Sequence, residues 1–385
     1  MFYLDRAATT PVRREVLEAM WPWLTGGFGN PSSTHGIGDQ AARGLADARA
    51  QVAAVLECRP AEVVFTAGGT EGANTAVKGL ALAAPRGRHV VTSAIEHEAV
   101  LASCDYLARF HDFTVTVLPV DRDGLVEPAV LAAALRPDTT LVSIAHADNE
   151  IGTVQDVPAL AAVAHAVGAR FHTDAVQSAP WLPVGLDRLG VDALTFSGHK
   201  LGAPKGTGVL ALRAGVPMEP LVHGGGQERG RRSGTEDVAG AVAVATALTL
   251  SDAARDTAAR TASATRDAVI TGVTARVPGA VLTGSPSARL PGHVSFCFGG
   301  TAELPGVNGE TVLLELEQRD VVSSSGSACA AGSTEASHVL TALGLPEDVA
   351  RSAVRLTFDA GLTLADVPLV VDAVASAVET VRAMG

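Results

Sequence analysis

The sequence predicts an α/β fold, with a mainly parallel sheet in a large domain and a smaller α+β domain toward the carboxyl end. Three observations lead to this prediction. The chain has 385 residues, of which 47% are apolar, so it can bury a large core. Short strand-like segments alternate with helix-like stretches over roughly the first 200 residues, which is typical of parallel sheets. The pattern then changes to a long alanine-rich helix and a few further strands.

Each element is expected from its local pattern. Helical periodicity covers residues 11–24 and 38–57, with the loop Asn30-Pro31-Ser32-Ser33 between them. The strand-like segments that follow are residues 63–66, 89–92, 115–118, 141–144, 170–173 and 193–196. A long helix is expected over about 236–275, and later strands over 294–298 and 353–358. We expect a large domain over residues 12–250 and a smaller one formed by residues 1–11 and 251–385.

The overall charge and the cysteine spacing narrow the class of protein. A formal net charge of −12, without a basic run, argues against direct binding to nucleic acid. The first residues do not resemble a signal peptide, and no apolar run reaches the length of a membrane span, so we expect a cytoplasmic protein without a membrane partner. The four cysteines are far apart and have no C-x-x-C spacing, so neither a disulfide scaffold nor a metal site is expected.

Lys200 is the strongest candidate for chemistry. Lys78, Lys200 and Lys205 are the only lysines of a chain that otherwise uses arginine as its basic residue. Arginine cannot form a Schiff base, so a retained lysine is a candidate nucleophile. Lys200 follows a strand-like run and the polar residues Ser197 and His199, which could bind an anion. An amine beside a phosphate pocket suggests pyridoxal phosphate.

A second anion-binding motif joins the strand at 63–66 to a helix. Gly68, Gly69 and Thr70 would expose backbone N–H groups at a helix N-terminus, where the helix dipole favours a phosphate. A plain tight turn is the simpler interpretation of this motif taken alone. It matches neither a Walker A loop nor a dinucleotide fingerprint, so a nucleotide ligand is not supported.

Two further strand ends carry polar residues suited to a pyridoxal cofactor. Asp174 follows the strand at 170–173, where a carboxylate could keep a pyridine nitrogen protonated, and Gln177 could bind the phenolic oxygen. His97 lies beyond the strand at 89–92, where it could stack on the ring and handle substrate protons. Asp174 as a helix N-cap and His97 as a structural histidine are the simpler alternatives.

Cys329 is the cysteine that we expect to react. It lies in a serine- and glycine-rich loop, Ser323 to Ser333, with no apolar neighbour larger than alanine. Cys297, by contrast, is surrounded by Val294, Phe296 and Phe298, as expected for a core residue. We therefore expect Cys329 to act as a thiolate on a mobile arm.

Together these motifs resemble the cysteine desulfurases of the class V aminotransferases, which are enzymes of pyridoxal-phosphate fold type I. The resemblance covers almost the whole chain, and the Ser-Gly-Ser-Ala-Cys loop around Cys329 is similar to that of group I. It implies a seven-stranded, mainly parallel sheet in the large domain. The matching segments are residues 3–11, 30–35, 149–152, 172–177, 197–200, 224–228, 232–236 and 324–329.

The resemblance also implies a role for each candidate residue. Lys200 would carry the cofactor as a Schiff base, and Cys329 would accept sulfur as a persulfide and could transiently contact a nascent iron-sulfur cluster. The phosphate would be bound by Gly69, Thr70, Ser197, His199 and, from the opposite subunit of a homodimer, Thr235. Asp174, Gln177 and His97 would tune the ring. Asn30, Asn149 and Arg355 would bind the substrate, with Arg355 pairing with its carboxylate.

The implied reaction converts L-cysteine to L-alanine and passes the sulfur to an acceptor, such as an iron-sulfur scaffold or a thiolation protein. Two alternatives stay open: a selenocysteine lyase or C-S lyase of the same family, and a catalytically silent scaffold for sulfur transfer. Two departures from the family pattern adjoin the substrate positions. Asp148 precedes Asn149 where asparagine is usual, and Phe358-Asp359-Ala360-Gly361 stands where Ser-Leu-Gly is typical.

Overall fold

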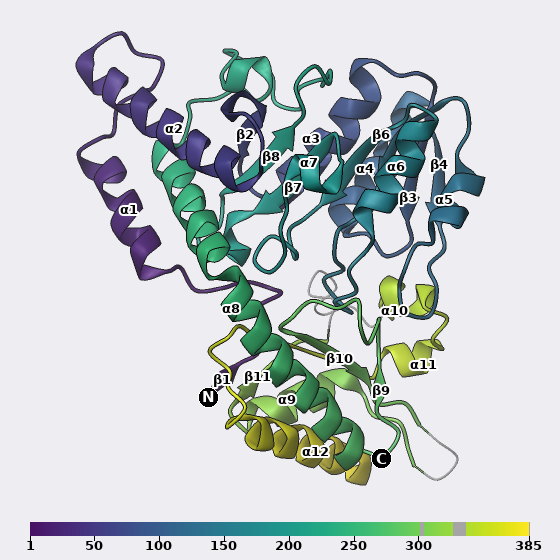
Figure 1. Ribbon diagram of the computed structural model, residues 1–385. Coiled ribbons are helices and arrows are strands. Elements are labelled where there is room, and N and C mark those ends of the chain that lie inside the picture. Colours follow the sequence, from purple (N-terminus) through teal and green to yellow (C-terminus); the bar gives the residue numbers. More distant parts are fainter. Residues whose placement is uncertain (301–303, 326–335, 385) are drawn as a thin grey trace.

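The computed structural model describes residues 1–300, 304–325 and 336–384, and its largest element is a seven-stranded sheet (Figure 1). The strand order is β2-β8-β7-β6-β5-β3-β4. β8 is antiparallel to both of its neighbours, whereas β7, β6, β5, β3 and β4 are mutually parallel, so the predicted mainly parallel sheet is confirmed. The strands are β2 (Val63–Thr66), β3 (His89–Ser93), β4 (Thr114–Leu118), β5 (Thr139–Ser143), β6 (Arg170–Asp174), β7 (Ala193–Ser197) and β8 (Gly208–Leu212).

Helices cover both faces of this sheet. Because both faces are covered, β3, β5, β7 and β8 are buried along their whole length. One face packs against α2 (Gly36–Val55), α5 (Pro128–Ala134), α6 (Val157–Ala166), α7 (Leu186–Leu189) and the first part of α8 (Val238–Arg276). The other face packs against α3 (Gly69–Ala83) and α4 (Glu98–His111). α1 (Arg14–Thr25) lies along α8.

A smaller body with its own core lies below the sheet in the view of Figure 1 and contains both termini. Its antiparallel strands follow the order β12-β10-β9, and β1 at the N-terminus pairs in parallel with β11. The strands are β1 (Phe2–Tyr3), β9 (Val281–Leu282), β10 (His293–Cys297), β11 (Val321–Val322) and β12 (Ala353–Thr357). The helices are α9 (Gly309–Glu317), α10 (His338–Ala342), α11 (Glu347–Ala350) and α12 (Val367–Met384).

The long helix α8 connects the two bodies. Its first half packs against one face of the sheet, and its second half packs against α12 of the smaller body. The expected domain boundary after residue 250 therefore falls inside this helix. Among the described residues, α8 is the one helix whose length and composition would allow it to cross a membrane, although no apolar run of that length was predicted. However, 56% of its most apolar window is buried inside the protein, as in a core helix.

Candidate active site

A cavity of about 420 Å³ lies where the carboxyl ends of the parallel strands meet the smaller body. This is the edge at which open α/β sheets bind their ligands. Most of the residues predicted for the site line it, although they come from segments far apart in the sequence. They are Gly69, Thr70, His97, Asn149, Asp174, Gln177, Ser197, His199, Lys200 and Arg355.

Lys200 lies at the end of η2 (Gly198–Lys200), a single turn that directly follows β7. A Cβ atom on Gly198 would lie 2.2 Å from Thr207 Oγ1, so glycine lets this turn pack closely against Thr207. The Lys200 Nζ donates hydrogen bonds to the carbonyl oxygens of Ala7 at 2.5 Å and Ala8 at 2.6 Å. The amine is therefore held at the cavity wall by the N-terminal segment.

The start of α3 forms a narrow cradle beside Lys200. Gly68 has a φ of +147°, which strongly favours glycine, and a Cβ atom on Gly69 would lie 2.7 Å from Val176 Cγ2. The first backbone N–H groups of α3 have no partner within the helix and carry its positive dipole end. Ser197 and His199 line the same cavity, and burial lowers the pKa of His199 to about 4, with Lys200 and Lys205 contributing.

Asp174 ends β6 and is buried at the floor of the cavity. Its Oδ1 accepts a hydrogen bond from the Val176 N–H at 2.8 Å, and burial raises its pKa. Gln177 also lines the cavity, and its Nε2 donates to the Ala7 carbonyl at 3.0 Å. His172, on the same strand, instead contacts Ser143 and Thr195 on the neighbouring strands, so it braces the sheet.

His97 is the N-cap residue of α4, and its Nδ1 accepts a hydrogen bond from the Ala99 N–H at 3.0 Å. Because Nδ1 accepts, the hydrogen of the neutral ring must be on Nε2. The cap thus fixes both the orientation and the tautomer of a side chain that lines the cavity.

Arg355 lies on β12 of the smaller body and is one of the most deeply buried large side chains in the described structure. Its Nη1 donates to the Asn149 carbonyl at 2.9 Å, and its Nη2 pairs with Asp5 Oδ1 at 2.7 Å. The guanidinium that we expect to bind the substrate's carboxylate is therefore already engaged by a carboxylate of the chain itself.

Three predicted residues do not line this cavity in the described part of the chain. Asn30 is exposed, and its Oδ1 accepts a hydrogen bond from the Ser32 N–H. Thr235 is exposed on the loop that follows η3 (Glu228–Gly230). Cys329 lies outside the described residues. The roles of these three residues remain predictions.

Comparison with known proteins identifies the family. The sequence model described as aminotransferase class-V matches residues 2–370. A protein named cysteine desulfurase IscS from Dictyoglomus turgidum is 42% identical over 99% of this chain and 95% of its own length. Another of that name, from Methanosarcina thermophila, is 43% identical over 99% of this chain and 93% of its own length. A solved structure titled NifS-like protein is 34% identical, with a TM-score of 0.90 over 98% of this chain and 99% of its own.

The chain belongs to the class-V aminotransferases, among their cysteine desulfurases. These enzymes depend on pyridoxal phosphate, so the cavity can be tested for its fit to that group. A second solved structure supports the same assignment. It is titled SspA in complex with cysteine and is 35% identical, with a TM-score of 0.80 over 93% of this chain and 99% of its own.

The residues of this cysteine desulfurase fit pyridoxal phosphate. The narrow cradle at Gly68 and Gly69 presents N–H groups for the phosphate, and side chains larger than hydrogen would fill it. Asp174 is a buried carboxylate with a raised pKa, which a cationic ring nitrogen would stabilise in its ionised form. Lys200 supplies the amine, and Ser197 and His199 lie beside the cradle.

The cavity of this cysteine desulfurase is also lined by Asp148 and Glu150, which the sequence analysis did not assign, and Glu96 is buried behind its wall between the lining residues Ile95 and His97. Burial raises the pKa of Glu96 to about 8 and that of Asp148 to about 7, and it also raises the pKa of Glu150. Glu96 and Asp148 could have been predicted from their positions shortly after β3 and β5, because the same argument from a strand end led to His97.

His338 also lines the cavity and was not predicted. Its Nε2 donates to the Glu96 carbonyl at 3.1 Å, and Nδ1 lies 3.8 Å from Glu98 Oε1. No local pattern could have indicated this residue, because its partners are more than 200 positions away in the sequence.

Proposed function

We propose that the enzyme converts L-cysteine to L-alanine and stores the sulfur on Cys329 as a persulfide for transfer to an acceptor protein. The observation that carries this proposal is that a single cavity contains Lys200, Asp174, His97 and Arg355. Bound pyridoxal phosphate supplies an electrophilic carbon and a cationic ring that stabilises negative charge on the substrate's Cα.

The chain's own residues then have distinct tasks. Arg355 pairs with the substrate's carboxylate, and the Asn149 carbonyl holds the guanidinium in place. The amine of Lys200 takes the proton from the substrate's Cα, and His97 handles protons at Nε2. Asp174 stabilises positive charge on the ring nitrogen.

Sulfur transfer balances without an external oxidant. The Cβ–S bond of cysteine breaks as a bond forms between Cys329 Sγ and the departing sulfur. The Cβ of the substrate gains one proton in place of the sulfur, which matches the proton that the Cys329 thiol loses. The outer sulfur of the persulfide keeps the proton of the substrate's thiol. Cys329 is oxidised to the persulfide level, and the substrate's Cβ is reduced to a methyl group.

The described ends of the segment that contains Cys329 support this role. Before it, Ser324 exchanges backbone hydrogen bonds with Arg355 at 2.6 and 3.2 Å. After it, Ser337 Oγ donates to Glu150 Oε2 at 2.5 Å. Both attachments are to residues that line the cavity, so the chain enters and leaves this segment at the cavity wall.

The other described cysteines are poorly suited to this chemistry. Burial raises the pKa of Cys58, Cys104 and Cys297 to about 12, so each stays a thiol near neutral pH. These three thiols are free, which fits a reducing compartment, and we include a cytoplasmic location in the proposal.

A homodimer is also part of the proposal. Leu17, Trp21 and Leu24 form an exposed apolar stripe on α1, with Phe28 and Ile37 nearby, and their exposed fractions range from 46% to 67%. Such a patch favours a protein interface. In a dimer, the exposed Thr235 could reach the partner's phosphate cradle, as the family resemblance implies. Trp21→Glu should shift the mass measured by light scattering toward a monomer, whereas the exposed control Phe110→Glu should not.

The central test uses Cys329→Ser. The variant should bind the cofactor with an unchanged absorbance spectrum, yet form no persulfide when mass spectrometry follows cysteine treatment. Cys58→Ser serves as the matched control and should form persulfide normally. Turnover at the wild-type rate in Cys329→Ser would refute the assignment. Release of the chalcogen without a protein persulfide, from cysteine or selenocysteine, would favour a lyase, and a colourless protein that cannot take up the cofactor would favour a silent scaffold.

The acceptor is proposed by class as an iron-sulfur scaffold or a thiolation protein. The test is to incubate the persulfide-bearing enzyme with a candidate acceptor and to measure by mass spectrometry where the extra sulfur resides. Transfer should move the mass of one sulfur atom from the peptide containing Cys329 to a cysteine of the acceptor.

A further inference from the structure

The first turn of α3 carries a carboxylate at the end of the helix where the phosphate is expected to bind. The Glu71 side chain folds back over this end, and its Oε2 accepts a hydrogen bond from the Ala67 N–H at 2.9 Å. A phosphate ester carries a charge of about −1.5 to −2 at neutral pH. The carboxylate and the phosphate would therefore repel each other at the same helix end, unless the charge of Glu71 is neutralised.

Arg232 provides the neutralising charge. Its Nε donates to Glu71 Oε1 at 2.9 Å, and its Nη2 lies 3.4 Å from Oε2, so the guanidinium faces both carboxylate oxygens. The two side chains are only 26% and 16% exposed, and solvent ions screen such a partly buried pair less than a fully exposed one. Arg232 thus brings a positive charge to the start of α3 from a loop that follows η3.

A second ion pair anchors the loop that carries Arg232. Glu228 on η3 and Arg49 on α2 form a bidentate pair with two distances of 2.7 Å, and the side chains are 2% and 7% exposed. Arg49 also donates to the Val63 carbonyl at 2.6 Å. Glu228 has a φ of +49°, which is uncommon for a residue other than glycine, so its conformation depends on such contacts. The loop is therefore fixed relative to β2, the strand that leads into α3.

The chain is also held at the residue after Arg232. The Ser233 N–H donates to the Val222 carbonyl at 3.1 Å, and Ser233 Oγ accepts from the Gly226 N–H at 3.3 Å. These contacts close the loop on itself beside the ion pair. The position of Arg232 thus does not depend on Glu71 alone.

We propose that Arg232 is a positioning residue for the cofactor's phosphate, which neutralises Glu71 so that this carboxylate can hold the Ala67 turn without repelling the phosphate. In this role Arg232 acts through Glu71 and not as a ligand of the phosphate. The inference rests on the proposed function, because it takes the start of α3 as the phosphate site.

The test compares pyridoxal phosphate with pyridoxal, which has the same ring and aldehyde but no phosphate. Fluorescence titration of the full chain freed of cofactor gives a dissociation constant for each. Arg232→Gln should raise the dissociation constant of pyridoxal phosphate about tenfold or more, since like charges brought together without compensation cost at least this much. The dissociation constant of pyridoxal should stay unchanged, whereas a general loss of packing would raise both.

Glu71→Gln tests the other half of the pair. Its amide oxygen can still accept from the Ala67 N–H, but the repulsive charge is gone, so this variant should bind pyridoxal phosphate at least as tightly as the wild type. The double variant Glu71→Gln with Arg232→Gln leaves no charge to neutralise. It should recover most of the affinity that Arg232→Gln alone loses.

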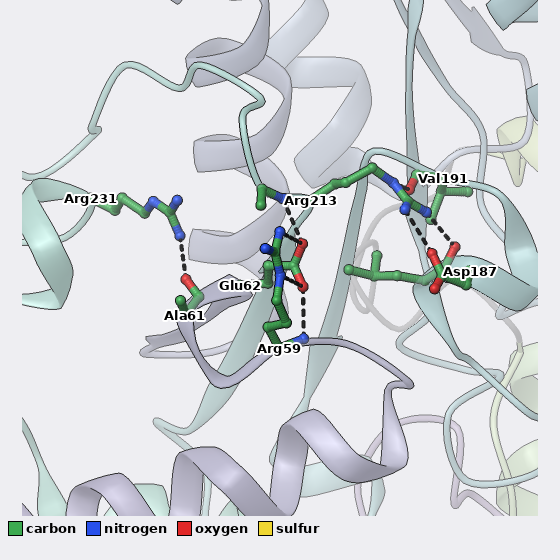
Figure 2. A network of polar contacts seen from close by, with 9 residues as sticks. Arg59, Ala61, Glu62, Asp187, Val191, Arg213 and Arg231 are labelled. Carbon is green, nitrogen blue, oxygen red and sulfur yellow. Dashed lines mark hydrogen bonds and ion pairs between the residues drawn. The ribbon is translucent and has the colours of Figure 1, made fainter.

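The matched control is Arg231→Gln, which removes the same charge from the neighbouring position. Arg231 Nη1 donates to the Ala61 carbonyl at 2.8 Å and forms no ion pair with Glu71 in the described structure (Figure 2). Both dissociation constants should stay close to those of the wild type in this variant.

Two results would overturn the proposal: Arg232→Gln that weakens both compounds equally, as a purely structural residue would, or a double variant that binds pyridoxal phosphate as weakly as Arg232→Gln does. If Arg232→Gln does not fold, Glu71→Gln decides, because weaker binding of pyridoxal phosphate relative to pyridoxal in that variant also contradicts the proposal.

Gly69→Ala distinguishes this failure from a failure of the phosphate site itself. If Gly69→Ala binds pyridoxal phosphate as the wild type does, the start of α3 is not the phosphate site. If Gly69→Ala is impaired and Arg232→Gln is not, only the role of Arg232 is wrong. None of these measurements involves Cys329 or cysteine turnover, so the sulfur-transfer part of the proposed function is tested separately.

Discussion

Both carboxylate oxygens of Glu96 lie 3.0 Å from the backbone nitrogen of Ala145 and accept its hydrogen bond. Ser93 Oγ donates to the same carboxylate at 2.6 Å. These contacts join the ends of β3 and β5 through the residue that precedes His97 and so help to hold the N-cap of α4 in place. Burial raises the pKa of Glu96 to about 8, with Asp174 and Asp148 adding to the effect, so the group is mostly protonated at neutral pH.

Replacing Glu96 by glutamine should change how stability depends on pH. The folded protein keeps the Glu96 proton over the range from about 4.5 to about 8, in which the unfolded chain loses it, so wild-type stability falls as pH rises. Glu96→Gln cannot ionise, and its stability relative to wild type should rise by about 1–3 kcal/mol between pH 5 and pH 9. Thermal unfolding measures this, with exposed Glu127→Gln as the control. Parallel stability curves for Glu96→Gln and wild type would contradict the prediction.

Glu62 should show the opposite pH dependence. Burial acts to raise its pKa, but hydrogen bonds from the Arg59 side chain and backbone and from the Ala214 N–H outweigh it and lower the pKa to about 2 (Figure 2). The stabilisation is present above about 4.5 and is lost as pH falls through about 2. Glu62→Gln should cost about 1–2 kcal/mol at pH 7 and almost nothing near pH 2.

Chemical unfolding at the two pH values measures the effect of Glu62→Gln. Glu15→Gln, at an exposed position on α1, is the control and should cost little at either pH. A constant cost for Glu62→Gln at both values would mean that its charge contributes nothing.

Asp174→Asn should impair the chemistry more than the fold. An amide cannot stabilise positive charge on the ring nitrogen, so alanine formation should fall about 10²- to 10⁴-fold while the cofactor's absorbance changes shape. The control is Asp192→Asn, because Asp192 is also buried but bonds to His165, Arg170 and the Phe171 N–H. That variant should melt earlier but turn over normally once folded. Equal losses of turnover in both variants would remove the special role of Asp174.

Gly69→Ala should weaken cofactor binding through a clash that a second mutation can relieve. The new Cβ would lie 2.7 Å from Val176 Cγ2, so the start of α3 must shift away from its position. We expect the cofactor's dissociation constant to rise about tenfold, for a loss of about 1.4 kcal/mol, and Gly69→Ala with Val176→Ala to recover most of it. Fluorescence titration measures both. Gly36→Ala, where a Cβ would meet nothing within 4 Å, is the control. No rescue by Val176→Ala would indicate another cause.

Local patterns predicted the sheet and much of the cavity. Six of the strands were expected from short apolar runs, and the polar residues beyond them meet because parallel strands end at the same edge. β8 was not predicted, because the glycines at 206 and 208 are typical of a turn, whereas the structure has a fully buried strand from Gly208 to Leu212.

What the sequence did not reveal depends on distant parts of the chain. Asp5 and Arg355 are 350 positions apart, and neither has a local signal that names the other. The contacts of Ala7 and Ala8 with Lys200 use backbone oxygens, which every residue has, so no residue type could indicate them. His338 was unassigned for the same reason.

The pairing of β1 with β11 sets the order in which the protein can be completed during synthesis. Phe2 is opposite Val321, so the first strand has no partner until the ribosome has added 319 further residues, which takes about 15–60 s at typical elongation rates. The seven-stranded sheet ends at Leu212 and can form well before then. The wall that holds Lys200 is therefore assembled last, and a nascent chain stalled before β11 would have its main sheet but an unfinished pocket.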